Sequence, residues 1–363
     1  MGPIYIDHGG TDAVHEPFLA MVFPSSFTIG PCHIGERHPP FIIAEAGLSH
    51  FGDMDLAHQL VDLAAKAGAD AFKTQFFDVD VLIAKRASEW RDRLRPRNLT
   101  FKQAREIKDL CDQRGLLFMS TAHDESRIPW LVELDVPAVK VGSGERNNPA
   151  FLKKLAALGK PMIVSTGMYS EPDVEEAIGA CAAGGCRQLA LLHCVTSYPT
   201  PAAQVNLAAM DRLKTMFPGP VGYSDHTVDG MAVLAAAARG AAIIEKHITI
   251  LRDVPNAHDW KVSAGPETFP QLVAEIRRMS AMIGHGRKEA APCESDGAKW
   301  ALKSLVAIQD LPAGHRLTEE DLTAKRPGGS IPPNRLHDVI GRRLTRGLKA
   351  DEALSWDNIE AEP

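Results

Sequence analysis

The stretch Val221–Thr249 reads VGYSDHTVDGMAVLAAAARGAAIIEKHIT and predicts a strand, a helix and a second strand. Two short apolar runs, each ending at polar residues, flank an alanine-rich segment over 230–239, and Gly240 is placed to end the helix. His226 and His247 each follow one of the two runs. If the two strands are parallel neighbours, both imidazoles emerge at the same edge of the sheet.

Two imidazoles at one sheet edge suit a divalent transition metal, because neutral histidine is a common ligand of such ions. A single histidine is more often a surface or hydrogen-bonded core residue, and the chain has 14 of them. The matched placement of His226 and His247 favours the metal interpretation for the pair.

The alternation of strand and helix continues on both sides of this unit. Further short apolar runs stop at polar residues at 41–44, 71–72, 116–119, 138–141, 162–164 and 189–192. Helices are expected at 54–67, 101–114, 148–158, 171–183, 207–217 and 267–283. Roughly eight strands alternating with helices are typical of an α/β fold of the (β/α)8 TIM-barrel type. A doubly wound open sheet is the alternative, but no glycine-rich dinucleotide fingerprint opens the chain.

The domain organisation follows from changes in composition along the chain. Residues 1–38 form an N-terminal extension to which we assign no function, and residues 39–289 form the barrel, in which the charged segment 78–98 is expected to be a long irregular loop. Residues 290–302 are small and polar, which suits a linker. Residues 303–363 contain short apolar pieces between Pro/Gly turns and predict a small β-rich module, whose thin core favours docking on another surface.

The overall composition excludes several functional classes. The 363 residues are 45% hydrophobic and 24% charged, as in soluble globular proteins, and the net charge of −6 gives no reason to expect nucleic acid or an anionic membrane as partner. No apolar run is long enough to span a bilayer, and the N-terminus lacks the pattern of a secretory signal. The six cysteines form no C-x-x-C pair, which indicates free thiols and a cytoplasmic protein.

Three lysines predict an anion site at the barrel mouth. Lys73, Lys140 and Lys246 each lie at a predicted strand end and are expected to point towards the mouth. Further hydrogen-bond donors are expected from Ser143, Ser165, Thr166 and the glycine amides near them. A phosphate, alone or together with a carboxylate, is the natural ligand. In the alternative, a lysine pairs with Glu45, Glu145 or Glu245 and only supports the mouth, or forms a Schiff base with a carbonyl substrate.

Other polar residues at strand ends are candidates for contact with a polyol. Glu45 and Glu145 can hydrogen-bond a sugar or move a proton, although buried structural carboxylates are the alternative. Tyr198 follows the sixth strand in the proline-stiffened sequence SYPTP, where it either lines a sugar pocket or packs under the loop. Asp259 and Ser263 follow the last strand and either complete the site or cap the last helix.

Seven motifs in a fixed order carry a family resemblance: IAEAGLSHFGD, DAFKTQFF, VKVGSGE, STGM, LLHCVTSYPTP, GYSDHT and IIEKHIT. On these motifs the chain resembles the sialic acid (N-acetylneuraminate) synthase family, and SLVA…LPAG…LTEEDL…KRPGGSIPP resembles that family's C-terminal antifreeze-like (SAF) domain. The resemblance covers about residues 40–360. It implies a metal-dependent condensation of phosphoenolpyruvate with an open-chain N-acyl hexosamine, which gives a nine-carbon 2-keto-3-deoxy acid and releases phosphate by C–O cleavage.

The resemblance also implies roles for individual residues. His226 and His247 would hold Mn2+ or Mg2+, and Glu145 would transfer a proton near the reacting carbons. The implied ligands of phosphoenolpyruvate are Lys73, Thr121, Lys140, Ser143 and Ser224. The residues implied to face the sugar are Glu45, Gln75, Tyr198 and Asp259. The family forms a domain-swapped homodimer, in which Arg326 of the KRPG motif would reach the sugar site of the partner subunit.

Three departures from the family pattern leave the acceptor sugar open. Ser49 stands where the first loop usually has Asn, Trp260 stands where the pattern D-H-x-x-S has His, and Thr196 stands where the sixth loop can have Asn. The acceptor is therefore N-acetylmannosamine, a diacetamido-trideoxy hexose, or a different aldose or sugar phosphate. A non-catalytic sugar-binding barrel is the remaining alternative, and the full set of charged strand-end residues speaks against it.

Overall fold

The computed structural model describes residues 23–35, 38–255 and 257–361. The chain divides into two compact units, Met1–Gly284 and His285–Pro363, each of which is described by itself. None of the helices in the described part of the chain is both long enough and apolar enough to cross a membrane.

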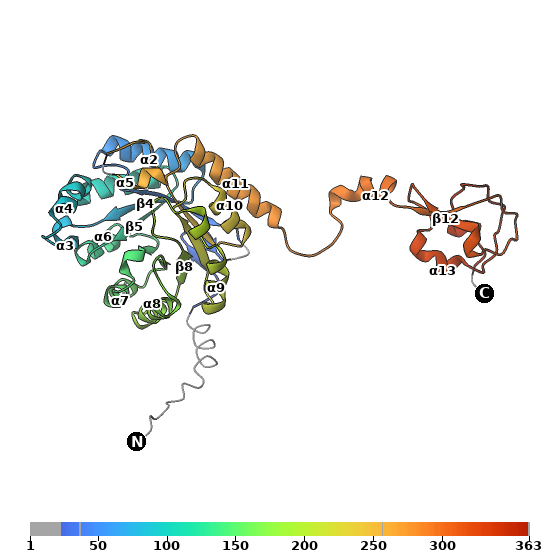
Figure 1. Cartoon of the computed structure of the whole chain (residues 1–363), viewed down its shortest axis with the longest axis horizontal. Coiled ribbons are helices and arrows are strands. Elements are labelled where there is room, and N and C mark those ends of the chain that lie inside the picture. Colours follow the sequence, from blue (N-terminus) through green and yellow to red (C-terminus); the bar gives the residue numbers. More distant parts are fainter. Residues whose placement is uncertain (1–22, 36–37, 256, 362–363) are drawn as a thin grey trace, which may run out of the picture. The chain divides into compact units, whose positions relative to one another are not determined.

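Parallel strands of the first unit close into an eight-stranded barrel (Figure 1). They are β3 (Phe41–Gly47), β4 (Ala71–Phe76), β5 (Leu117–Ala122), β6 (Val139–Val141), β7 (Met162–Ser165), β8 (Leu189–His193), β9 (Val221–Asp225) and β10 (Ile243–His247). The barrel closes because β10 pairs with both β9 and β3. The predicted (β/α)8 barrel is confirmed.

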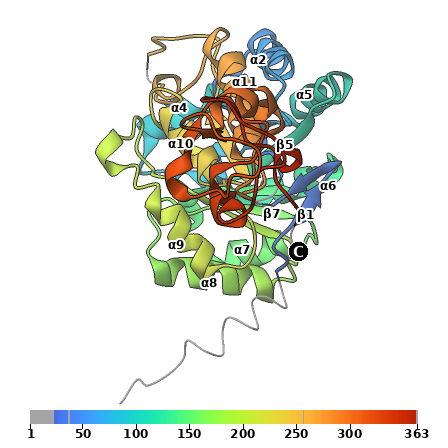
Figure 2. The same ribbon diagram turned by 90° about the vertical axis from the view of Figure 1, so that its right-hand side faces the viewer.

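Helices cover the outside of the barrel, with α2, α5 and α11 on one side and α7, α8 and α9 on another (Figures 1 and 2). Their bounds are α2 (Met54–Ala67), α5 (Phe101–Gln113), α6 (Ile128–Glu133), α7 (Pro149–Ala156), α8 (Glu171–Ala183), α9 (Ala208–Met216), α10 (Met231–Ala238) and α11 (Thr268–Ile283). Helix α2 shows how the sequence sets these bounds. The Asp53 carboxylate accepts hydrogen bonds from the first free backbone N–H groups, and Gly68 ends the helix in the left-handed conformation.

Between β4 and α5, the segment 78–98 differs from its prediction. It folds into two short helices, α3 (Val79–Leu82) and α4 (Ser88–Leu94), rather than an irregular loop. Their apolar side chains, together with Phe77, form a small cluster of their own. The sequence did not predict these helices, because the few apolar side chains that pack are separated by charged residues.

Strand side chains alternate between the barrel interior and the surrounding helices. The inward residues near the strand starts are apolar and fully buried: Phe41, Ile43, Ala71, Met119, Ala138, Ile163, Ala190, Leu192 and Ile243. Two residues further along several strands, the same inward face carries polar side chains, such as Glu45 and Lys73. The barrel is thus apolar at its N-terminal end and polar at its C-terminal mouth.

An antiparallel hairpin of β1 (Phe27–Ile29) and β2 (Cys32–Ile34) packs on the apolar end. Phe27, Ile29 and Ile34 belong to the same buried cluster as the inward strand residues. Each contributes about 1.5–3 kcal/mol by burial of its side chain. The hairpin lies in the segment to which the sequence assigned no role, and it closes the N-terminal end of the barrel.

The second unit is a small β-rich module, as predicted. It contains α12 (Ser295–Ala301), β11 (Ser304–Ala307), β12 (Leu322–Lys325) and α13 (Leu336–Val339), and β11 pairs antiparallel with β12. Its core is built mainly from leucine side chains such as Leu305, Leu317 and Leu344. Helix α12 falls within residues 290–302, where the sequence predicted a linker.

Short 3-10 turns complete the secondary structure. They are η1 (Arg95–Arg97), η2 (Glu125–Arg127), η3 (Ser143–Glu145), η4 (Ala202–Gln204), η5 (Asp259–Lys261), η6 (Pro292–Glu294), η7 (Glu319–Asp321), η8 (Pro333–Arg335) and η9 (Trp356–Asn358).

Candidate active site

A cavity of about 690 Å3 opens at the C-terminal ends of the barrel strands. Most of the expected site residues of the first unit line it: Glu45, Lys73, Gln75, Thr121, Lys140, Ser143, Glu145, Tyr198, Ser224, His226, His247 and Asp259. Lys246, Thr166 and Ser263 do not. Arg326 belongs to the second unit, where its guanidinium lies 5.9 Å from the centre of the Trp300 ring.

Two lysines and two glutamates form a buried ionic cluster at the bottom of the cavity. Lys73 Nζ lies 2.8 Å from Glu45 Oε2 and 3.6 Å from Glu245 Oε2, and Lys140 Nζ lies 3.6 Å from Glu245 Oε1. All four side chains are at most about 5% exposed. Charges so deeply buried are stable only when paired, so these residues are held in fixed positions.

The ionic cluster shifts the pKa values of its members in different directions. Burial raises the pKa of Glu245, but Lys140 and Lys73 outweigh it and hold that pKa at about 2. Burial raises the pKa of Glu45, and the nearby charge of Glu245 adds to the effect against the opposing influence of Lys73. Glu245 is therefore a fixed anion, whereas Glu45 accepts a proton more readily than an ordinary carboxylate.

Sequence reasoning did not single out Glu245 as a site residue, but only as a partner that a lysine might have. The structure places its carboxylate between the two pocket lysines, where it also accepts a hydrogen bond of 3.1 Å from Ser224 Oγ. The signal was present in the sequence, because Glu245 and His247 are two residues apart on one strand and share a face.

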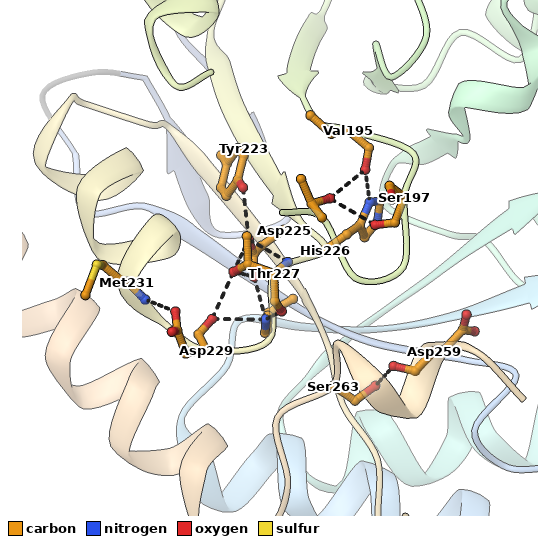
Figure 3. Close-up of polar contacts among 12 residues, drawn as sticks. Val195, Ser197, Tyr223, Asp225, His226, Thr227, Asp229, Met231, Asp259 and Ser263 are labelled. Carbon is orange, nitrogen blue, oxygen red and sulfur yellow. Dashed lines mark hydrogen bonds and ion pairs between the residues drawn. The ribbon is translucent and has the colours of Figure 1, made fainter. Parts of the chain in front are cut away.

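The expectation for Lys246 is wrong, because its side chain faces away from the cavity. Its ammonium forms a buried ion pair with Asp225 and donates to the Thr227 carbonyl at 2.8 Å. Tyr223 and Thr227 donate to the same Asp225 carboxylate (Figure 3). The residues beside it, Glu245 and His247, point inward, so alternation places Lys246 on the outer face. Lys246 thus braces the loop that follows β9.

The hydroxyl groups expected near an anion serve different purposes. Lys140 Nζ donates to Ser165 Oγ at 2.7 Å, and Ser143 Oγ accepts from the backbone N–H of Gly167 at 2.9 Å. Both serines line the cavity. Thr166 instead donates to the Leu192 carbonyl at 3.0 Å, which ties β7 to β8. Gly167 is required there, since an added Cβ would lie 2.3 Å from Thr196 Oγ1.

His226 and His247 lie at the ends of the neighbouring strands β9 and β10, with ring centroids 5.4 Å apart. His226 Nδ1 lies 2.6 Å from the Val195 carbonyl (Figure 3), and its Nε2 lies 3.0 Å from the Tyr198 hydroxyl. Within the described residues, the buried Nδ1 of His247 has no hydrogen-bond partner. Burial lowers the pKa of both rings, that of His247 to about 4, so both are neutral at pH 7.

These two rings fit a divalent metal. Their neutral nitrogens are the form that binds metal, and the orphaned Nδ1 of His247 is a buried polar atom that lacks a partner. In the described part of the chain, no group of three or more His, Cys, Asp or Glu side chains is arranged to hold a metal. A metal at this pair would therefore have only two protein ligands.

The carboxylates expected on the sugar side come from two turns and one strand. Glu145 ends η3, where it accepts a hydrogen bond of 2.8 Å from Asn148 Nδ2, and burial raises its pKa. Gln75 Nε2 donates to Glu45 Oε1 at 2.9 Å. Asp259 begins η5 and lines the cavity. Ser263, which was a second candidate, donates to the Asp259 carbonyl at 2.7 Å (Figure 3) and so shapes this turn.

A further wall of the cavity comes from the segment between β4 and α5. Phe77, Leu82, Ile83, Arg86 and Trp90 line it, and the sequence did not mark any of them. Of the three departures from the family pattern, Thr196 lines the same cavity. Ser49 and Trp260 line a smaller neighbouring cavity of about 110 Å3.

Comparison with known proteins agrees with the family resemblance and with the barrel fold. The model of the NeuB family matches residues 60–288, and that of the SAF domain matches residues 303–360. The N,N'-diacetyllegionaminic acid synthase of Legionella pneumophila is 36% identical over 338 residues, which are 88% of this chain and 95% of that protein. The human N-acetylneuraminate-9-phosphate synthase is 31% identical over 90% of this chain and 94% of its own length. A crystal structure of N-acetylneuraminic acid synthetase from Leptospira borgpetersenii covers 76% of this chain and 95% of that chain, with 34% identity and a TM-score of 0.71.

Proposed function

The chain belongs to the NeuB family, and on this premise we propose that it condenses phosphoenolpyruvate with an N-acyl hexosamine to give a nonulosonic acid and phosphate. The observation that carries the proposal is the shared cavity. It combines two buried lysines, a neutral histidine pair and four carboxylates at the mouth of one barrel. Such a set of residues can hold an anionic substrate and a polyol side by side.

Phosphoenolpyruvate would bind at the lysine end of the cavity. Lys73 and Lys140 supply positive charge, and Thr121, Ser143 and Ser224 supply hydroxyl groups around them. Glu245 favours the protonated form of both lysines, since its carboxylate lies 3.6 Å from each ammonium. It raises the pKa of Lys73 against burial, whereas burial outweighs it at Lys140 and lowers that pKa. This fixed arrangement reduces the cost of orienting the reacting C3 carbon.

We propose His226 and His247 as the ligands of a divalent metal, Mn2+ or Mg2+. When bound, the metal would act as a Lewis acid on the aldehyde oxygen of the acceptor. The protein's part is to set the ring tautomer. The hydrogen bond from His226 Nδ1–H to the Val195 carbonyl leaves the lone pair on Nε2, the nitrogen that faces Tyr198.

The reaction needs one new C–C bond and one broken C–O bond. C3 of phosphoenolpyruvate bonds to the aldehyde carbon, whose oxygen takes up a proton, and water bonds to C2 and loses a proton. The C2 hydroxyl then loses its proton and becomes the ketone as the C2–O bond to phosphate breaks. The phosphate leaves with the electron pair of that bond and takes up a proton. Glu145 and Glu45, whose pKa values are both raised by burial, are our candidates for moving these protons.

The proposal also concerns which sugar is the acceptor. The apolar side chains of Phe77, Leu82 and Ile83 favour an unphosphorylated sugar with acetamido or methyl groups, such as N-acetylmannosamine or a diacetamido-trideoxy hexose. A sugar phosphate is the second candidate. Arg86 lines the same wall and has the charge to bind it.

We also propose a cytoplasmic homodimer in which Arg326 reaches the sugar site of the partner subunit. Mixing His247→Ala chains with Arg326→Ala chains tests this. A domain-swapped dimer regains activity, since one of the two sites in a mixed dimer has both intact residues. Absence of any recovery from mixed dimers would contradict a shared site.

The deciding experiment is phosphate release from phosphoenolpyruvate with Mn2+ across a panel of N-acyl hexosamines and sugar phosphates, with mass analysis of the product. Turnover with an N-acyl hexosamine supports the proposal, and turnover with a sugar phosphate alone supports the second candidate. Removal of the metal with a chelator must abolish phosphate release, and addition of Mn2+ must restore it. A rate that survives chelation, or a product trapped by borohydride, would favour a Schiff-base lyase instead.

A further inference from the structure

His123 is a cavity residue that the proposed function leaves without a role. It directly follows β5, whose inward face also carries Met119 and Thr121, and its side chain lines the cavity. Its backbone N–H donates to the Phe76 carbonyl at 2.9 Å, which ties it to the end of β4. The ring is therefore held at the lysine end of the cavity by two neighbouring strands.

The imidazole of His123 lies among positive charges and has no partner of its own. In the described part of the chain, neither ring nitrogen takes part in a hydrogen bond or ion pair. Its Cε1 atom lies 3.7 Å from the place that a Cβ on Gly142 would take, so the ring faces the turn that carries Ser143. Burial lowers the pKa of His123 to about 4, and Lys73 and then Lys140 add to the effect.

The other charged groups near His123 are committed elsewhere. Asp124 accepts hydrogen bonds from the backbone N–H groups of Asp78, at 2.6 Å, and Ser126, at 2.9 Å. Glu45 and Glu245 lie beyond the lysines and pair with them. Arg86 lines the same cavity and adds a further positive charge. In the described part of the chain, the charges that act on the ring of His123 are those of Lys73 and Lys140.

The protonation state of a neutral ring that shares a cavity with two ammonium groups can change when an anion enters. A phosphate dianion at Lys73 and Lys140 places negative charge next to the ring and reverses the electrostatic balance. The imidazole can then bind a proton and donate a hydrogen bond to a phosphate oxygen. A phenylalanine would fill the same space, but it could not respond to the ligand in this way.

We propose that His123 binds the phosphate group of phosphoenolpyruvate, takes up a proton as the dianion enters, and returns that proton to the departing phosphate. This inference rests on the proposed function. As the C2–O bond breaks, its electron pair goes to the bridging oxygen, and the proton on His123 transfers to the phosphate. The imidazole returns to its neutral form, while the C2 hydroxyl gives its proton to water and becomes the ketone.

The test is a calorimetric titration of phosphoenolpyruvate into the full chain with excess Mn2+ at pH 7.5, repeated in buffers of different ionisation enthalpy. The dependence on the buffer gives the number of protons taken up per ligand bound. We expect the wild-type chain to take up about one proton more than His123→Gln, because glutamine keeps a hydrogen-bond donor but cannot be protonated. The matched control is His58→Gln, since His58 is an exposed histidine 2.9 Å from Glu106 and outside the cavity.

Steady-state kinetics show whether His123 acts as an acid or only packs in the cavity. For His123→Gln we expect kcat to fall about 10²- to 10⁴-fold with a much smaller change in KM for phosphoenolpyruvate. The melting temperature should match that of the wild-type chain. Binding without a difference in proton uptake between the wild-type chain and His123→Gln, or a variant with full kcat, would overturn the role of His123. If the wild-type chain does not bind phosphoenolpyruvate at all, it is the proposed function that fails.

Discussion

The two ends of the barrel are built by the same strands but respond to opposite physical demands. On β3, Ile43 and Glu45 are two residues apart, face the same interior and are 0% and 1% exposed. Ile43 joins an apolar cluster that the N-terminal hairpin completes, whereas Glu45 pairs with Lys73 at the mouth. Burial of Ile43 stabilises the fold outright, while burial of Glu45 costs free energy that its partner offsets. The comparison teaches that stability is concentrated at one end and chemistry at the other.

The largest expected effect is on turnover at the mouth. Replacing His247 by alanine removes one of only two proposed metal ligands, so kcat/KM should fall by about 10³-fold or more. The melting temperature should stay close to that of the wild-type chain or rise, because the variant also removes a buried nitrogen that lacks a hydrogen-bond partner. The measurements are phosphate release in metal-controlled buffer and a thermal melt.

His226→Ala is the matched variant on the neighbouring strand and should lose a similar factor in kcat/KM. Its melting temperature should fall, because the Val195 carbonyl and the Tyr198 hydroxyl lose a hydrogen-bond partner. Full activity of either variant in that buffer would contradict the assignment of these two histidines as metal ligands. If either variant fails to fold, the mouth also contributes to stability, and the proposed separation between the two ends of the barrel is wrong.

The second prediction concerns Lys246, which lies between two mouth residues but belongs to neither end. Lys246→Met leaves the Asp225 carboxylate buried and unpaired, since Asp225 is 0% exposed. We expect a loss of about 3–5 kcal/mol in the free energy of unfolding. Urea denaturation of the folded variant measures it.

The control is the double variant Lys246→Met with Asp225→Asn, which removes both charges but keeps an oxygen that can accept from Tyr223 and Thr227, and it should recover part of that loss. A single variant as stable as the wild-type chain would show that the pair does not brace the loop after β9.

The third prediction is made at the apolar end. Ile43→Ala removes buried methyl groups beneath Glu45 and should cost about 2–5 kcal/mol in the free energy of unfolding. The kcat of the folded fraction should stay within about twofold of the wild-type value, because the ionic cluster keeps its partners. Urea denaturation and phosphate release, measured on the same sample, test both halves. A large fall in kcat for the folded fraction would mean that the two ends are coupled.

Most of the fold and of the site was predictable because both follow from strand periodicity and strand ends. The barrel follows from apolar runs that stop at polar residues, and the same rule located Lys73, Lys140 and both histidines. The rule wrongly placed Lys246 at the mouth, because it ignored that successive side chains along a strand point to opposite faces. Counting inward positions on β10 assigns Glu245 and His247 to the cavity and Lys246 to the outer face.

Other features were not predictable from local pattern. Helices α3 and α4 owe their fold to a small cluster whose members are scattered among charges. The hairpin of β1 and β2 is stable because the open end of the barrel offers it an apolar surface, which no local sequence records. The role of His123 depends on Lys73 and Lys140, which come from two other strands and meet it only in the folded chain.

The smallest expected effect tests whether a loss of stability at the apolar end follows the volume of the group removed. Ile163 is fully buried in the apolar cluster, two residues before Ser165, which accepts a hydrogen bond from Lys140. Ile163→Val removes a single methylene-sized group and should cost about 0.5–1.5 kcal/mol, a fraction of the loss expected for Ile43→Ala. The apolar end therefore responds in proportion to the volume removed, because packing energy is a sum of many small contacts. The mouth has no such gradation, since loss of one ligand or one charge removes a whole function. Urea midpoints for Ile163→Val and Ile43→Ala, set beside their kcat values, measure this difference. If Ile163→Val changes kcat more than twofold, packing at the apolar end positions Lys140, and the separation between the two ends is incomplete.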